Sequence, residues 1–349
     1  MTVRQPSAPE RPVRPRPARA TAAIAKEIGP PRRPGRRIAG ISALLLPYRS
    51  DGAIDEAGFR RHLRRTRAAG LRVAVNMDTG YGDLLTEVER RRVLAWASEE
   101  HAGAGADAQF IAGALPRGGG REPWRAYARA GAEIAAAGGV PILFPSPAFA
   151  KLDDAGLVRL FREAAAAAEH FLAFELGTMF NPHGRMFSER VWRALLDMPQ
   201  CLGVKHSSLR RDWEWERLRW RDRQRPGFAI YSGNDLAADM IEYGSDYLLG
   251  LSTFAPELFA ARDRAWEQGS AGYLELRDMV QYLGWAGFRA PVPAYKHAAA
   301  IFLKLTGGLE DDSTHPRAPR REAWDRALLA DAAERMRQVC PEAAGTPRG

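Results

Sequence analysis

The amino-acid sequence predicts an α/β protein: a closed (β/α)8 barrel of the TIM type, followed by a C-terminal helical extension. Short apolar runs alternate with longer stretches of helical period eight times between residues 38 and 268. Such alternation is typical of βα units with a parallel sheet. Doubly wound sheets usually contain five or six strands, whereas eight successive units are the number that closes a barrel.

The first two units illustrate how each element is recognised. The apolar run at 38–46 predicts a strand, and the stretch 55–70 carries Phe59 and Leu63 on one face with charged residues opposite. That pattern predicts an amphipathic helix. A second strand at 71–77 precedes a helix at 86–101, which opens on Thr86 with Glu89 three residues later, the spacing of a capping box. Both units therefore have defined starts and ends.

The remaining six units repeat this order. Strands are predicted at 108–113, 140–144, 171–176, 201–205, 228–233 and 246–251. Each of these strands is followed by a predicted helix. In the same order, the six helices span about 121–137, span about 153–168, begin at Ser188, end at about 221, begin at Asn234 and begin at about 255. Three further helical stretches are predicted at about 271–286, 293–306 and 320–339, separated by Gly and Pro.

The positive charge lies at the N-terminus. Residues 1–37 hold nine Arg and one Lys against two Glu, a charge of +8, while the whole chain carries +9. This segment also has eight prolines and few large apolar residues, so it is predicted to be a disordered tail. The predicted division is 1–37 tail, 38–268 barrel, 269–340 helical extension and 341–349 flexible end.

Composition disfavours several classes of protein. The nearly neutral body argues against a nucleic-acid partner, and no apolar run is long enough to predict a membrane span. Two cysteines, Cys201 and Cys340, form neither a disulfide framework nor a zinc motif. Metal chemistry is disfavoured because His206 is the one histidine near a predicted strand end. We expect a cytoplasmic protein without a metal.

Lys205 ends the sixth predicted strand, in the stretch CLGVKHSS. Active residues of barrels lie at the carboxyl ends of strands, and Lys205 is the one lysine at such an end. An amine that is partly desolvated there has a lowered pKa and can attack a carbonyl carbon to form an imine. The alternative is a structural lysine paired with a carboxylate such as Asp78, Asp83 or Glu175.

The turn after the second strand, MDTGYGD at 77–83, is glycine-rich. Its backbone amides could hold a carboxylate or phosphate, and Thr79 adds a hydroxyl. The turn matches neither the P-loop nor GxGxxG, so a nucleotide site is disfavoured. The alternative is an ordinary connection between a strand and a helix.

Several motifs resemble those of the dihydrodipicolinate synthase / N-acetylneuraminate lyase family of Schiff-base barrels. They occur in the family's order over about residues 38–340 and comprise LLLPYRSDGAID (44–55), MDTGYGDLLTEVER (77–90), GVKHSS (203–208), YSGND (231–235) and APVPAYKHA (290–298). The resemblance implies that Lys205 forms the imine with a 2-oxo acid such as pyruvate. It also implies that the Thr79 hydroxyl and the amides of Thr79 and Gly80 hold the carboxylate.

This chain also departs from the family's pattern. Asp78 and Tyr81 stand where the family has a threonine and a glutamate. The strand-5 tyrosine that moves protons at the imine is replaced by Phe174 or Phe180, depending on the alignment. Alignment on Phe180 matches Arg185 to the family's substrate-carboxylate arginine. A second family tyrosine, after strand 4, is also missing.

A proton shuttle is still required, because imine formation and carbon–carbon cleavage both move protons. The sequence candidates are Asp78, Glu175, Tyr81, Tyr48 and His206, although His206 is expected to point to the other face of its strand. A carboxyl near Lys205 could serve if the barrel interior raises its pKa. Alternatively, Glu175 is a salt-bridge partner of Lys205 and Asp78 is a turn residue.

We therefore predict Lys205, Glu175 and Asp78 as catalytic residues. Residues at the strand ends and in the motifs are predicted to bind substrate: Thr79, Gly80, Tyr81, Tyr48, Arg185, Gly233 and Ser252. No cofactor is expected beyond the covalent lysine imine, and the resemblance implies a homo-oligomer, either a dimer or a tetramer.

The predicted function is a class I lyase of the aldolase or dehydratase type. Its substrate would be a 2-oxo acid such as pyruvate or a pyruvyl-containing sugar acid. Lysine biosynthesis is disfavoured because both family tyrosines are missing. The alternative is a catalytically altered family member that acts as a binding or regulatory protein.

Overall fold

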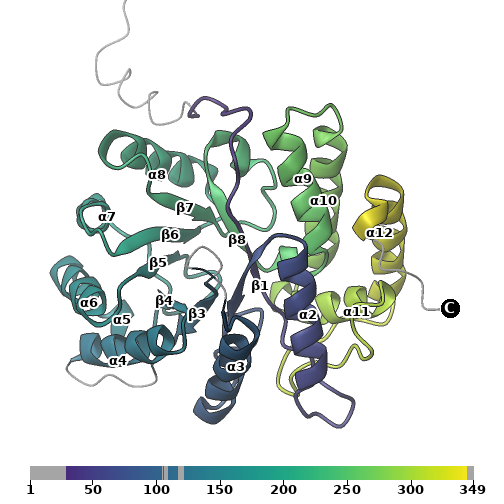
Figure 1. The fold of residues 1–349 in the computed structure, drawn as a ribbon, viewed down its shortest axis with the longest axis horizontal. Helices are drawn as coiled ribbons and strands as arrows, with labels where there is room; N and C mark the ends of the chain where they lie inside the picture. Colours follow the sequence, from purple (N-terminus) through teal and green to yellow (C-terminus); the bar gives the residue numbers. More distant parts are fainter. Residues whose placement is uncertain (1–28, 104, 106–108, 117–121, 344–349) are drawn as a thin grey trace, which may run out of the picture.

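Eight parallel strands close into a barrel in sequence order, as predicted. The structure, a computed structural model, describes residues 29–103, 105, 109–116 and 122–343. Figure 1 looks onto the barrel, with most of its helices around the outside. The strands are β1 Gly40–Ala43, β2 Arg72–Val75, β3 Ile111–Ala114, β4 Val140–Leu143, β5 Phe171–Leu176, β6 Cys201–Ser207, β7 Ala229–Ser232 and β8 Asp246–Leu249.

The outer helices match the predicted units with one exception. They are α2 Glu56–Ala68, α3 Glu87–Glu100, α4 Pro123–Ala136, α6 Asp154–Ala167, α7 Glu189–Leu196, α8 Arg211–Gln224 and α9 Pro256–Glu267. A short helix that was not predicted, α5 Pro147–Ala150, precedes α6. The predicted capping box is present: Thr86 Oγ1 accepts from the Glu89 amide, and Glu89 Oε2 accepts from the Thr86 amide.

The exception is the helix predicted from Asn234, which is wrong. β7 is followed by a turn and a short 3-10 helix, η2 Met240–Tyr243. The side-chain carbonyl of Asn234 accepts a hydrogen bond from the Leu236 backbone amide. Gly244 ends η2 with a φ of 107°. A side-chain carbonyl that binds the backbone two residues on stabilises a turn in competition with a helix. β8 is followed first by another 3-10 helix, η3 Leu251–Thr253.

Side-chain alternation divides the apolar residues into two cores. Leu172, Phe174 and Leu176 of β5 belong to a small cluster inside the barrel, whereas Phe171 and Ala173 pack in the larger cluster between strands and helices. Successive side chains of a strand point to opposite faces, so position along a strand determines whether a residue faces the barrel interior or the helices.

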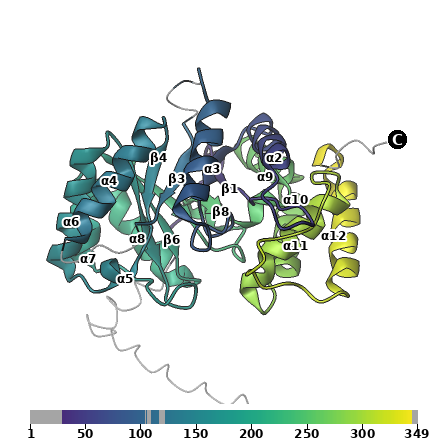
Figure 2. The ribbon, with the colours of Figure 1, turned by 90° about the horizontal axis from the view of Figure 1, so that it is seen from below.

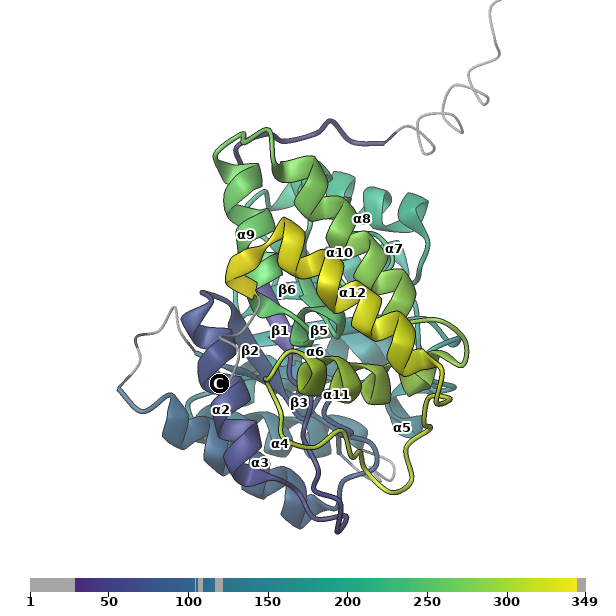
Figure 3. The same ribbon diagram turned by 90° about the vertical axis from the view of Figure 1, so that its right-hand side faces the viewer.

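The C-terminal extension lies beside the barrel. It contains α10 Tyr273–Gly287, η4 Val292–Ala294, α11 Tyr295–Leu305 and α12 Asp325–Val339. α10 packs on α9, and α12 packs across α10 and α11 (Figures 2 and 3). The connection through η4 brings the start of α11 back to the barrel.

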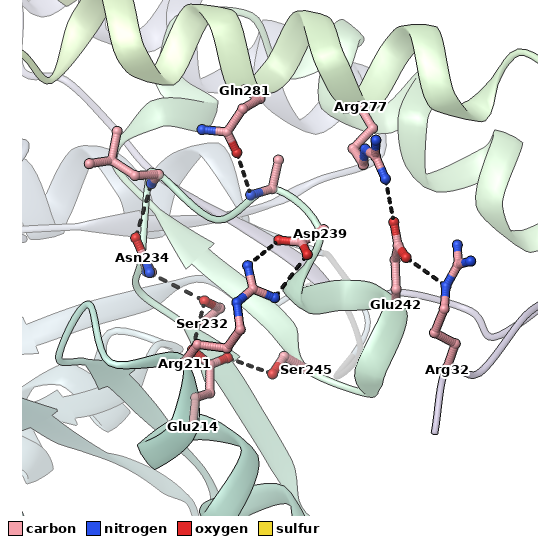
Figure 4. Close-up of polar contacts among 12 residues, drawn as sticks. Arg32, Arg211, Glu214, Ser232, Asn234, Asp239, Glu242, Ser245, Arg277 and Gln281 are labelled. Atoms are coloured by element: carbon pink, nitrogen blue, oxygen red, sulfur yellow. Dashed lines mark hydrogen bonds and ion pairs between the residues drawn. The ribbon is translucent and has the colours of Figure 1, made fainter. Parts of the chain in front are cut away.

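Both predicted terminal boundaries need correction. Arg32, Arg33 and Arg36, in the predicted tail, form ion pairs with Glu242, Asp222 and Asp246 respectively. Figure 4 shows Arg32 and Arg277 on the same Glu242 carboxylate. At the other end, η5 Pro341–Ala343 buries Ala343, within the segment predicted to be flexible. The rest of both predicted segments, 1–28 and 344–349, lies outside the described residues.

Among the described residues, no helix combines the length and the apolar character that crossing a bilayer requires.

Candidate active site

A cavity of about 380 Å³ opens at the carboxyl ends of the strands, where barrel chemistry is expected. Its lining comes from the ends of several strands, the loop after β5 and the start of α11. Four residues predicted for the site contribute to this lining: Lys205, Asp78, Thr79 and Gly233. The structure thus brings the predicted nucleophile and the predicted carboxylate-binding turn to one cavity.

Lys205 projects into this cavity from β6. Its ammonium lies 4.7 Å from the ring centroid of Phe174 and has no hydrogen-bond or ion-pair partner among the described residues. A Cβ at position 233 would lie 2.8 Å from Lys205 Cε, so Gly233 leaves the room that the lysine stem occupies. Desolvation lowers the pKa of Lys205 to about 8, although the charges of Asp235 and Asp78 act to raise it.

Asp78 and Thr79 share a partner that the sequence prediction missed. The Tyr295 hydroxyl, at the start of α11, lies 2.8 Å from Asp78 Oδ2 and 2.9 Å from Thr79 Oγ1. The next residue, Lys296, is buried and its Nζ lies 2.8 Å from Asp78 Oδ1. The Asp78 side chain is 58 % exposed, and this surface faces the cavity.

The charges of this cluster follow from its contacts. Desolvation by itself raises the pKa of Asp78, but the Lys296 charge and the hydrogen bonds from Lys296 and Tyr295 outweigh it, and the pKa is lowered. Desolvation and the Asp78 charge raise the pKa of Tyr295 well above its ordinary value. Asp78 is therefore a carboxylate and Tyr295 a neutral phenol. Asp78 therefore lacks the raised pKa expected of a carboxyl that moves protons beside Lys205.

Asp235 is a second carboxyl at the cavity, from the turn after β7. Its Oδ1 accepts from the Leu251 amide at 2.7 Å. Desolvation raises its pKa to about 6, against the lowering effects of that hydrogen bond and of the Lys205 charge. Asp235, rather than Asp78 or Glu175, has the raised pKa predicted for a carboxyl near the lysine.

Glu175 does not reach the cavity, which corrects its predicted catalytic role. It follows Phe174 on β5, so its side chain points outward to the helices. It is fully buried there, where it accepts hydrogen bonds from the Phe187 amide at 2.7 Å and from His206 and Arg217, each at 2.7 Å. Burial acts to raise its pKa, but the interactions with His206 and Arg217 outweigh burial and hold the pKa at about 2. His206 points away from the cavity, as expected.

Arg185 and Gly80 also differ from their predicted roles. Arg185 is held by the Leu152 carbonyl and by Asp154, at 3.1 Å from its carboxylate, and it is not part of the cavity lining. The Gly80 amide donates to the Met77 carbonyl at 3.1 Å inside its own turn. An amide used this way is not available to a substrate carboxylate.

Three further predicted substrate contacts are buried away from the cavity. Tyr48 and Tyr81 pack edge to face with centroids 5.6 Å apart, and both are almost fully buried. Ser252 is fully buried and its hydroxyl donates to the Leu249 carbonyl at 2.9 Å. These side chains support the barrel and do not line the cavity.

The residues that sequence reasoning missed are Tyr295, Lys296 and Asp235. All three lay within motifs already singled out, Tyr295 and Lys296 in APVPAYKHA and Asp235 in YSGND. Their signal was a polar residue at the end of a matched motif. However, a polar residue in the extension shows its role only once the path of α11 is known.

The rest of the cavity wall is largely apolar. Phe144 and Phe174 meet edge to face with centroids 4.9 Å apart, and Leu176 follows on the inner face of β5. The loop after β5 adds Met179 and Phe180, whose side chains are partly exposed. An apolar wall of this kind favours a ligand group that carries few hydroxyls.

Comparison with known proteins identifies similar chains and folds. No family model matches this chain. A 4-hydroxy-tetrahydrodipicolinate synthase of Salinibacter ruber is 27% identical over 300 residues, which cover 77% of this chain and 94% of that protein. Ruminococcus gnavus sialic acid aldolase has the same fold, with a TM-score of 0.72 at 15% identity over 88% of this chain and 99% of the aldolase.

A third similar protein is a prophage protein from E. coli K12 that belongs to the dihydrodipicolinic acid synthase family. Its structure, in complex with pyruvate, has a TM-score of 0.72 at 17% identity. The match covers 86% of this chain and 98% of that one. At these identities the two solved structures show the fold.

Proposed function

We propose that this chain, a divergent member of the dihydrodipicolinate synthase / N-acetylneuraminate lyase family, is a class I lyase that acts on a 2-oxo acid through an imine on Lys205. The observation that carries the proposal is the position of the Lys205 amine in the cavity, where it has no hydrogen-bond or ion-pair partner among the described residues and where desolvation lowers its pKa to about 8. Near neutral pH a larger fraction of such an amine is neutral than of an ordinary lysine, and the neutral form can attack a carbonyl carbon.

Thr79 is proposed to receive the substrate carboxylate. Its hydroxyl lines the cavity, and its backbone amide has no hydrogen-bond partner among the described residues, unlike the amide of Gly80. A carboxylate held by one amide and one hydroxyl would place the neighbouring ketone between Thr79 and Lys205. The protonated imine then withdraws electrons from the adjacent carbon, which assists cleavage or formation of the next carbon–carbon or carbon–oxygen bond.

The substrate's other end is proposed to be an apolar group, aromatic in size. Phe144, Leu176 and Phe180 form the wall that such a group would meet. Hydroxyls of a sugar acid that face these three side chains would lack the partners that buried hydroxyls need, although Ser146, Asn181 and His183 also line the cavity. The position of Arg185 supports the expectation against lysine biosynthesis. This residue, matched to the family's substrate-carboxylate arginine, pairs with Asp154 and does not line the cavity.

Borohydride trapping tests the imine. Incubation with pyruvate followed by borohydride is expected to add one reduced pyruvyl group, and peptide mapping should place it on Lys205 and not on Lys296. The initial rate should rise with pH and level off above about 8, where the amine is neutral. If a broad panel of 2-oxo acids gives no adduct, the lyase proposal is wrong and the alternative binding or regulatory role is favoured.

An aldehyde panel tests the substrate class. With pyruvate as donor, we expect benzaldehyde to be consumed at least about tenfold faster than glyceraldehyde or 4-oxobutanoate, as measured by product mass. Phe180→Ser should lower this preference about tenfold, because about 1.4 kcal/mol of apolar burial is lost. Leu274→Ser, at an exposed position on α10, is the matched control. Preference for either hydrophilic aldehyde would contradict the apolar assignment.

The homo-oligomer, as a dimer or tetramer, and the cytoplasmic location stay predictions from the sequence.

A further inference from the structure

The proposed reaction needs a phenol or another group that moves protons, and the residue on β5 cannot supply it. Phe174 stands on the inner face of β5, beside Lys205, and has no hydroxyl. A phenol reaches the same cavity from the C-terminal extension instead. Tyr295 is the first residue of α11, which the chain enters after η4.

We propose that Tyr295 is the residue that transfers protons at the Lys205 imine, with Asp78 as its hydrogen-bond acceptor and Lys296 as the cation that holds Asp78 in place. This inference rests on the proposed function, because it assigns a step of the same reaction. Tyr295 is the catalytic residue in this assignment, and Asp78 and Lys296 are positioning residues.

Packing fixes the direction of the Tyr295 hydroxyl. The ring stacks on Phe288 with centroids 4.4 Å apart and planes 17° apart. On another side, a Cβ at position 250 would lie 3.0 Å from both Tyr295 Cε2 and Thr79 Oγ1, so Gly250 allows the close approach of the phenol and the threonine. The hydroxyl is therefore presented beside the group proposed to bind the substrate carboxylate.

The hydrogen bonds suit a relay. A carboxylate can only accept, so the Tyr295 proton points to Asp78 while the site is empty. The Thr79 hydroxyl, 2.9 Å from the phenol oxygen, can donate to that oxygen in the empty site and turns to the substrate carboxylate when one is bound. Lys296, 2.8 Å from Asp78 Oδ1, offsets the negative charge that would otherwise accumulate when the phenol gives up its proton. Because Lys296 is itself buried, its ion pair also holds Asp78 in one position.

The proton count of imine formation matches one relay group. The Lys205 ammonium and a ketone give a protonated imine and water, so two protons move from nitrogen to the departing oxygen and none is gained or lost overall. A phenol that donates its proton to the oxygen and is then reprotonated from the nitrogen moves one of these protons, and a second round moves the other. Positioned acid–base groups contribute about 10²–10⁴-fold to rate.

Tyr295→Phe tests the assignment because it removes one oxygen and keeps the ring. We expect the rate constant of borohydride-trapped imine formation to fall about 100-fold at saturating pyruvate, with the half-saturating pyruvate concentration changed less than about threefold. Tyr282→Phe is the matched control, since it also removes a hydroxyl from the extension but pairs with Asp331 at the surface. Thermal denaturation verifies folding of both variants.

A pair of carboxylate variants gives a second readout with opposite signs. Both Asp78 and Asp235 raise the pKa of Lys205, so loss of either charge alone should make the amine more reactive at pH 7. Asp235→Asn is therefore expected to speed trapping. Asp78→Asn is expected to slow it about tenfold, because Asp78, unlike Asp235, accepts a hydrogen bond from Tyr295. This comparison of two carboxylate variants tests the assignment of Tyr295 even if Tyr295→Phe does not fold.

The outcomes separate this inference from the proposed function. An adduct that forms equally fast in the wild-type protein and Tyr295→Phe would overturn the role of Tyr295 while leaving the lyase proposal intact. A variant that loses only affinity for pyruvate would show that Tyr295 merely positions Thr79, which also overturns it. Absence of any adduct in the wild-type protein would reject both. Acceleration by Asp78→Asn, like that by Asp235→Asn, would reject the relay.

Discussion

Lys205→Ala is expected to abolish the pyruvate adduct and to lower any aldol or retro-aldol activity more than about 1,000-fold. Without the amine there is no nucleophile, and what binding and the remaining acid–base groups contribute cannot replace a covalent intermediate. Intact-protein mass after borohydride measures the adduct, and a coupled assay with the preferred aldehyde measures turnover. The protein should stay folded, because the Lys205 ammonium makes no hydrogen bond or ion pair within the described residues.

Two further variants make this result specific. Lys205→Arg keeps a long cation but presents a guanidinium that stays protonated at any workable pH, so it should be as inactive as alanine. Lys304→Ala removes a lysine on α11 that pairs with Asp312 at the surface and should trap pyruvate like the wild-type protein. Adduct formation by Lys205→Ala at an undiminished rate would move the imine to another amine, with Lys296 the nearest alternative by its contact with Asp78.

Glu175→Gln is expected to lower the free energy of unfolding by about 3–5 kcal/mol at pH 7. The carboxylate is fully buried, and its replacement leaves the Arg217 cation, itself almost fully buried, without its counter-charge. Breaking a buried pair on one side costs about this much, because a desolvated charge stays uncompensated. Urea denaturation, followed by circular dichroism, measures the change.

The free energy of unfolding of the wild-type protein should depend on pH through the same Glu175 carboxylate. The pKa of Glu175 is about 2 in the folded protein and 4.5 in its ordinary state. A lowered folded pKa stabilises the protein above the unfolded value, so this contribution is lost as the pH falls from about 4.5 toward 2. In Glu175→Gln that part of the acid destabilisation should be missing.

A surface glutamate, Glu163, serves as the control for Glu175. Glu163→Gln, on the exposed face of α6 where it pairs with Arg159, should change stability by less than about 0.5 kcal/mol. At a temperature where Glu175→Gln is folded, the Glu175→Gln variant should trap pyruvate at close to the wild-type rate. Loss of trapping in the folded variant would restore the catalytic role that the sequence predicted for Glu175.

Glu175 and Lys205 show which part of the site the sequence can predict. Strand ends follow from apolar runs and their breaks, so the sequence placed Lys205 correctly at the carboxyl end of β6. Neighbouring residues on a strand face opposite sides, and a boundary error of one residue exchanges the two faces. Sequence reasoning treated Glu175 as a residue of the mouth, whereas the register that pairs Phe174 with Lys205 turns Phe174 inward and Glu175 outward.

The barrel itself was determined by the sequence, because strand and helix periods are local properties that each segment carries within about 20 residues. The positions of Lys205, which we propose as the nucleophile, and of the turn of Asp78 and Thr79 were determined in the same way, by their places at strand ends. Only the tertiary structure decided which side chains complete the site. Tyr295 and Lys296 lie more than 200 residues beyond Asp78, and their contact depends on how α10 and α12 direct α11 to the barrel mouth, which no local pattern encodes.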